Sequence, residues 1–78
     1  MGTLNTAVNS ASTFATTISA TATVTHNLGT KDVIVQLYDT VTDLTVYARV
    51  NRASTNTVTI TFGTTPANDV RVLIQKIG

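Results

Sequence analysis

The stretch VTHNLGTKDVIVQLYD, residues 24–39, decides the fold of this chain. It joins the end of one alternating segment to a turn around Gly29 and then to the most apolar segment of the protein, residues 31–39. Side chains alternate between the two faces of a strand, so this segment presents Val33, Val35 and Leu37 on one face and Ile34, Gln36 and Tyr38 on the other. Both faces are partly apolar. This pattern predicts either a central strand covered on both sides or a strand with one face that meets a partner.

Shorter alternating segments lie on both sides of this strand. Val, Ile, Thr and aromatic residues are frequent in them, and these residue types favour strands. The expected strands are residues 13–19, 20–26, 31–39, 44–52, 57–62 and 69–77, separated by turns at 27–30, 40–43 and 53–56 and by a longer loop at 63–68. We also expect Tyr38 and Tyr47 to pair across the 40–43 hairpin. Six short strands predict an all-β fold, a small antiparallel β-sandwich or barrel formed by residues 13–78.

Residues 1–12, MGTLNTAVNSAS, are small, polar and weakly patterned, and we interpret them as an extended N-terminal arm. Two interpretations stay open for this arm. It is either a disordered terminus or a segment that becomes ordered on a partner. In the second case the apolar residues of this region, Leu4, Val8 and Phe14, make the contact.

The size and composition of the chain favour association with other subunits. With 78 residues it forms one domain with a small core, and small domains usually need disulfides, metals or partners. There is no Cys, no Glu and only one His, so disulfides are excluded and a zinc site is not expected. A homo-oligomer is therefore the expected state.

Charge is sparse and dispersed, with a formal net charge of +1. Nucleic-acid binders concentrate basic residues on one face, so we expect no nucleic-acid partner. The 18 Thr residues give strands a polar surface with little charge. No apolar leader segment follows Met1 and no membrane-spanning stretch occurs, so we expect synthesis in a cytoplasm and no membrane partner.

The titratable residues do not form a pattern typical of catalysis. The four Asp residues lie at expected strand ends or loops, and no Ser lies in a nucleophile-elbow context. We expect no enzyme activity and no cofactor. His26 is interpreted as a strand-end residue that hydrogen-bonds a backbone or Asp group and fixes the turn with Asn27 and Gly29. A metal ligand, a pH switch or a receptor contact are the alternatives for His26.

Three segments in order, VTHNLGTKDVIVQLYD, YARVNRASTNTVTITF and, after a Pro-containing loop, VRVLI, carry a resemblance. They resemble a β-sandwich module of bacteriophage virion proteins, found in capsid decoration (cement) proteins and near the ends of tail-fibre proteins. The resemblance spans roughly residues 19–77. It implies a structural, non-enzymatic protein that forms homo-oligomers, commonly trimers, and binds other virion or host-surface proteins.

Because only residues 1–12 precede the first expected strand, we expect a capsid decoration protein rather than a fibre. Such a protein is made in the host bacterial cytoplasm, lies on the capsid surface of the virion, and binds the major capsid protein so that it bridges capsid subunits. The expected oligomer interface consists of Ile34, Tyr38, Tyr47, Arg49, Arg71 and Leu73. Arg49 and Arg71 have an alternative role as edge-strand charges that block unwanted pairing. A tail-fibre or spike component that binds a host glycan or protein through residues 40–43 and 63–68 is the alternative function.

Overall fold

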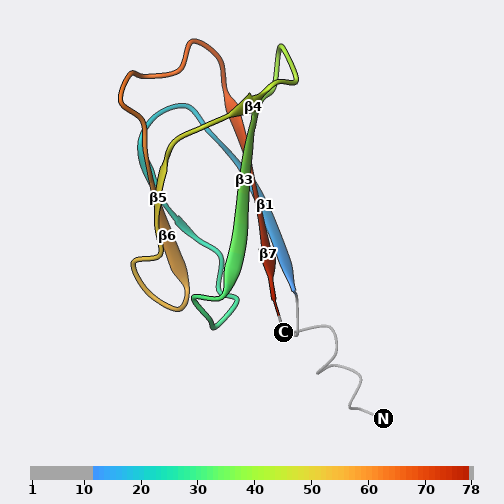
Figure 1. Cartoon of the computed structure of the whole chain (residues 1–78), viewed down its shortest axis with the longest axis vertical. Coiled ribbons are helices and arrows are strands. Elements are labelled where there is room, and N and C mark those ends of the chain that lie inside the picture. Colours follow the sequence, from blue (N-terminus) through green and yellow to red (C-terminus); the bar gives the residue numbers. More distant parts are fainter. Residues whose placement is uncertain (1–11, 78) are drawn as a thin grey trace.

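The computed structural model describes residues 12–77, which form seven β-strands in two antiparallel sheets (Figure 1). The strands are β1 (Thr13–Ile18), β2 (Ala22–Thr25), β3 (Val33–Asp39), β4 (Thr45–Val46), β5 (Arg49–Asn51), β6 (Thr57–Thr61) and β7 (Val70–Lys76). One sheet has four strands in the order β1-β7-β3-β4, and the other has three in the order β2-β6-β5. The predicted all-β fold and small antiparallel β-sandwich are confirmed.

The last strand of the chain lies in the middle of the four-stranded sheet. β7 pairs with β1 on one side, where Ala15 faces Leu73, and with β3 on the other, where Leu73 faces Gln36. The last strand therefore joins the first and the third strands into one sheet, because β1 and β3 both pair with β7.

The core lies between the two sheets and consists of alternate residues from their central strands. Val58 and Ile60 on β6 and Val70 and Val72 on β7 are fully buried. The other buried apolar residues are Val24, Leu28, Val33, Leu37 and Ile74. On β3 this places Val33, Val35 and Leu37 inward and leaves Ile34 and Gln36 on the outer surface.

The predicted single strand at residues 44–52 is wrong, because this segment divides between the sheets. β4 pairs with β3 in the four-stranded sheet, whereas β5 pairs with β6 in the three-stranded sheet. Residues 47 and 48 make the crossover. The side-chain alternation continues through it, since Val46, Ala48 and Val50 are all half-buried. Alternation reports which side chains are buried, but it does not report which strand supplies the backbone partner.

Two smaller expectations about this segment also need correction. Tyr38 pairs with Thr45 and not with Tyr47, because Tyr47 lies in the crossover and outside the ladder. Leu44, the first residue of the expected strand, is 67% exposed because it precedes β4 in the hairpin loop.

The predicted arm falls mostly outside the described residues, and this includes Leu4 and Val8. Phe14, which we grouped with the arm, lies within β1, and its half-buried side chain packs against the core. Grouping Phe14 with the arm is therefore corrected. No helix among residues 12–77 is long and apolar enough to cross a membrane.

Candidate interaction surface

The outer face of the four-stranded sheet is hollowed between β1 and β4. Its residues form three rows across the strands, because opposite residues of an antiparallel pair share a face. From the N-terminal end of β1 the rows are Thr13, Gln75 and Ile34, then Ala15, Leu73 and Gln36, then Thr17, Arg71, Tyr38 and Thr45. Side chains of all three rows line an open hollow of about 940 Å³, which Asp43 borders at the β4 end.

The floor of this outer-face hollow is apolar and its border is polar. Ile34 is 54% exposed and Leu73 is 39% exposed, and the register places them diagonally across adjacent strands. The Arg71 guanidinium donates to the Thr17 hydroxyl (3.1 Å), so this cation lies along the sheet and borders the apolar floor. Apolar residues inside a polar border are the usual arrangement of a protein contact surface.

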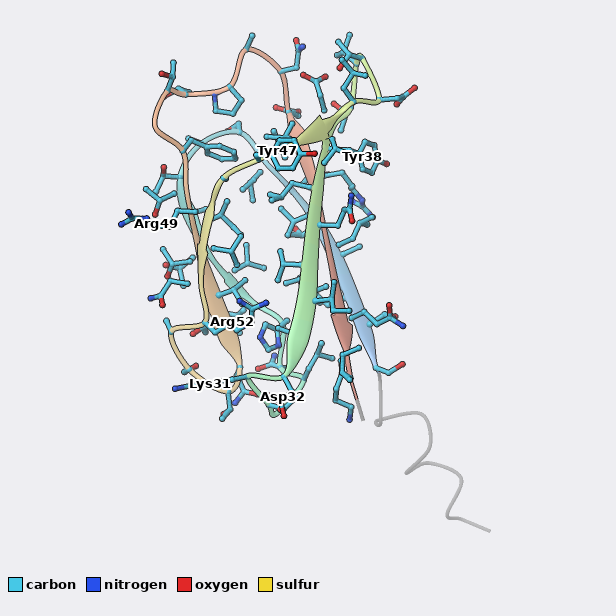
Figure 2. The ribbon with its side chains drawn as sticks, in the orientation of Figure 1. Lys31, Asp32, Tyr38, Tyr47, Arg49 and Arg52 are labelled. Carbon is cyan, nitrogen blue, oxygen red and sulfur yellow. The ribbon has the colours of Figure 1, made fainter. Side chains whose placement is uncertain are left out.

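The structure brings together four of the six residues expected at the oligomer interface. Ile34, Tyr38, Arg71 and Leu73 all belong to the outer face of the four-stranded sheet. Arg49 does not, because it lies on the outer face of the other sheet opposite Thr61, and Figure 2 shows it on the opposite side of the sandwich from Tyr38. Tyr47 is 90% exposed in the crossover.

The outer face of the three-stranded sheet differs from the hollow. It carries the outward residues of β2, β6 and β5, which are Thr23, Thr25, Thr57, Thr59, Thr61, Arg49 and Asn51. The Thr23 and Thr59 hydroxyls lie 3.4 Å apart across β2 and β6. This polar face holds no exposed large apolar side chain among the described residues.

The two loops that we expected to touch a host receptor are joined at one end of the sandwich. The Thr40 N–H and hydroxyl both donate to the Asp69 carbonyl (3.0 and 2.9 Å). The Asn68 amide donates to both oxygens of Asp39, at 3.3 and 3.1 Å. Asp39 also accepts the N–H groups of Val41 and Thr42 (2.8 and 3.0 Å), and these hydrogen bonds, led by that from Thr42, lower the pKa of its carboxyl.

This loop end exposes three large side chains, Val41 (71%), Leu44 (67%) and Tyr47 (90%). Asp43 follows the hairpin turn with φ 61°, which is the left-handed conformation that Asp tolerates better than most residues. The loop-end residues are therefore held on a hydrogen-bonded base but present apolar groups to solvent.

His26, Asn27 and Gly29 form a turn at the other end of the sandwich. The side chain of His26 is 4% exposed, and its Nδ1 accepts the Leu28 N–H at 3.0 Å. An accepting Nδ1 carries no proton, so the ring is the neutral tautomer with a proton on Nε2. Burial lowers the pKa of His26. Nε2 has no hydrogen-bond partner among the described residues.

Positive φ angles shape this turn, at Gly29 (φ 75°) and at Asn27 (φ 55°). Asn and Gly are the residues that adopt this conformation at least cost. Lys31 and Asp32 follow the turn as exposed residues and lie at the same end of the sandwich (Figure 2).

Asn56, which the sequence analysis missed, fastens the His26 turn to the β5–β6 turn. Its carbonyl accepts the N–H groups of His26 (2.8 Å) and Asn27 (3.2 Å), and its side-chain oxygen accepts the Gly29 N–H (2.9 Å). Asn is common in turns, but nothing in the sequence pairs this turn with residues 26–29.

Arg52, also missed, bridges the two sheets. It follows β5, and its Nε and NH2 groups donate to the Val33 carbonyl on β3 at 3.3 and 2.7 Å. β4 pairs only with Leu37 and Tyr38, so this half of β3 has an open edge. Arg52 is an exposed residue, and in Figure 2 its side chain lies across the gap between β5 and β3.

No group of three or more His, Cys, Asp or Glu residues within 12–77 is arranged to hold a metal ion. No protein-family model matches the chain, and no curated protein and no solved structure is significantly similar to it.

Proposed function

We propose that this chain is a non-enzymatic structural protein of a bacteriophage virion that decorates the capsid. In this proposal the outer-face hollow carries the function. It forms the contact with neighbouring copies, with the trimer as the expected state, and the oligomer bridges subunits of the major capsid protein. The single observation that supports this is the exposed apolar floor of Ile34 and Leu73 on an otherwise polar surface.

The energetics of the hollow favour a protein partner. Two half-exposed aliphatic side chains, a Tyr ring and an Ala can be removed from water together, and each Å² of apolar surface that is buried contributes about 25 cal/mol. The neighbouring groups, Gln36, Gln75 and the Thr13 hydroxyl, are uncharged. Burying uncharged polar groups that find hydrogen-bond partners costs less than burying ions.

A second candidate function rests on the loop end. A tail-fibre or spike component would bind the host surface through the exposed Val41, Leu44 and Tyr47. An exposed Tyr contributes a flat apolar ring and a hydroxyl, which suits contacts with glycans and proteins. The hydrogen bonds from Asn68 to Asp39 and from Thr40 to Asp69 would hold this end rigid and lower the entropic cost of binding.

Electron microscopy of virions labelled with antibody against the chain tests both functions. We expect label distributed over the capsid shell. Label confined to the tail tip would replace the first proposal by the second, and virions of the phage that encodes the chain without label anywhere would overturn both.

Co-sedimentation with capsids tests the surface. The double variant Ile34→Lys and Leu73→Lys places two charges on the apolar floor, which should separate the copies. Because a single copy then loses the multivalent contact of the oligomer with the capsid, this variant is expected to lose at least tenfold in binding. The matched control is Thr23→Lys with Thr61→Lys, which adds the same charge to the outer face of the three-stranded sheet and is expected to bind normally. Equal binding by the two double variants would contradict the assignment of the hollow.

A further inference from the structure

Among residues 12–77, β1 is an outer strand, and the backbone groups along its outer edge have no partner strand. The Lys76 N–H donates to the Ser12 carbonyl at 2.7 Å, and hydrogen-bonded pairs alternate along an antiparallel ladder. The backbone groups of Phe14, Thr16 and Ile18 therefore face β7. Those of Thr13, Ala15 and Thr17 face away from the sheet, where no strand of residues 12–77 pairs with them (Figure 1).

The other side of this sheet is protected against unwanted pairing, but β1 is not. β4 has only two residues, and Arg52 occupies the Val33 carbonyl on the open part of β3. Short edge strands, charges and Pro are the usual devices that prevent strand addition. β1 has six residues, TFATTI, with no charge and no Pro.

The inner face of β1 is also incompletely covered. Phe14, Thr16 and Ile18 alternate inward and are half-buried, whereas Val70, Val72 and Ile74 on the adjacent β7 are 0–2% exposed. A further strand beside β1 would cover Phe14 and Ile18 and would use the free backbone groups at the same time.

We propose that a second copy of this chain supplies that strand, through antiparallel pairing of β1 with β1 about a two-fold axis at Ala15. In this register Ala15 faces Ala15 of the second copy and Thr13 faces Thr17, and each of these pairs exchanges two backbone hydrogen bonds. Phe14 then faces Thr16 and lies diagonal to Ile18 across the interface, so inner-face side chains meet inner-face side chains. The small Ala side chain at the axis leaves room on the outer face.

The sequence of β1 favours a second copy of β1 as the partner strand at this edge. A two-fold antiparallel contact presents the same residues from both sides, and the alternating free donors and acceptors of β1 complement themselves in this arrangement. With Thr as its only polar residue type, the strand carries no charge that an oppositely charged partner would need to match. The contact goes beyond the proposed function, because it joins copies in pairs through backbone hydrogen bonds at the β1 edge. A three-fold contact at the hollow, which the Thr13 and Ala15 side chains also line, would instead use side chains of the outer face. Where both form, β1 joins two trimers.

Disulfide cross-linking tests the register. The chain contains no Cys, so single Cys variants give a clean background. The Cα atoms of a hydrogen-bonded antiparallel pair lie about 5.5 Å apart, which fits a disulfide. Ala15→Cys is expected to form a covalent dimer under mild oxidation, seen by non-reducing electrophoresis.

Thr13→Cys is the matched control on the same edge and the same face. Its two copies would lie four residues apart along the paired strands, about 13 Å, so this variant is expected to form no covalent dimer. A mixture of Thr13→Cys and Thr17→Cys is expected to form the mixed dimer. Cross-linking of Ala15→Cys that is no faster than that of Thr13→Cys would overturn the proposal.

A second variant tests the contact without oxidation. Ala15→Pro removes an N–H that points to the free edge, so the ladder between β1 and β7 keeps its hydrogen bonds. We expect unchanged far-UV circular dichroism and loss of the two-fold association in analytical ultracentrifugation. Unchanged association of Ala15→Pro would contradict the proposal. A second contradicting result is loss of capsid binding by Ala15→Pro together with no cross-linking of Ala15→Cys, because this combination assigns the β1 edge to a strand of another protein. The cross-linking and ultracentrifugation measurements do not depend on where the chain lies in a virion.

Discussion

Protonation of His26 should weaken the fold as the pH falls below 6.5. In the folded protein Nδ1 accepts the Leu28 N–H and the ring is 4% exposed. A proton on Nδ1 would remove this hydrogen bond, place two donors against each other and bury a charge. In the unfolded chain the ring is free to protonate at its ordinary pKa of 6.5.

The sign and size of the effect follow from proton linkage. The folded-state pKa is lowered, so the unfolded state binds more protons as the pH falls, and stability decreases with it. The full contribution is present above pH 6.5, and it is lost as the pH falls from there toward the folded-state pKa. Proton linkage limits the loss between pH 7.5 and pH 5.5 to at most about 1.4 kcal/mol, the value of one proton over one pH unit below the unfolded-state pKa of 6.5.

Urea unfolding at pH 7.5 and pH 5.5, followed by circular dichroism, measures this difference directly. His26→Asn is the control, because an Asn side-chain oxygen can still accept the Leu28 N–H while the titratable ring is removed. We expect the variant to be less stable than the parent at pH 7.5, because it leaves a cavity. Its free energy of unfolding should nevertheless change little between the two pH values.

The result that refutes this reasoning is equal pH dependence in the parent and in His26→Asn. His26 is the only His in the chain, and the pKa of Asp39 is lowered from 3.8 and therefore lies below this range. A titration of the His26 ring by NMR supplies an independent check. It should show protonation below pH 6.5 in the folded protein and at about 6.5 in urea.

Three further changes test other parts of the structure. Arg52→Ala should lower the free energy of unfolding by about 1–2 kcal/mol in chemical denaturation, because it leaves the Val33 carbonyl without its charged donor. Arg52→Lys should restore only part of this free energy. No loss in Arg52→Ala would show that the bridge between the sheets does not stabilise the fold. Asp39→Asn should reduce the loss of thermal stability in acid. The lowered pKa of Asp39 contributes stability above pH 3.8, and this contribution disappears as the pH falls through the folded-state pKa of Asp39. If the melting temperatures of variant and parent change identically from pH 5 to pH 2, this prediction is wrong. Gly29→Ala should lower the free energy of unfolding by about 1 kcal/mol. The cause is the positive φ of 75°, since a Cβ at this position would meet no atom within 4 Å. Gly29→Asn should lower it less in the same unfolding assay, and equal losses would argue against a conformational cause.

The sequence predicts which residues of the apolar floor face outward from their strands, but it does not predict that Ile34 and Leu73 lie next to each other. The alternation of residues 31–39 indicated that Ile34 and Tyr38 share the face opposite Val33 and Leu37, and this agrees with the structure. Leu73 lies 39 positions further along the chain, and it becomes a diagonal neighbour of Ile34 only because β7 inserts between β1 and β3. Tyr47 and Arg49 were grouped with these residues because a single strand was expected at 44–52, and the crossover between the sheets separates them.

By itself the sequence determined the all-β class, the buried face of most strands and the turn at Gly29, since these depend on side-chain alternation and on local backbone conformation. The order of the strands, the division of residues 44–52, the role of Asn56 and the role of Arg52 were decided only by the tertiary structure. Backbone N–H and C=O groups are the same in nearly every residue, so the pattern of side chains does not specify which partner they bind. That choice depends on the packing of the whole sandwich. In this protein it left the β1 edge without a partner strand among residues 12–77, and it brought the residues of the outer-face hollow together.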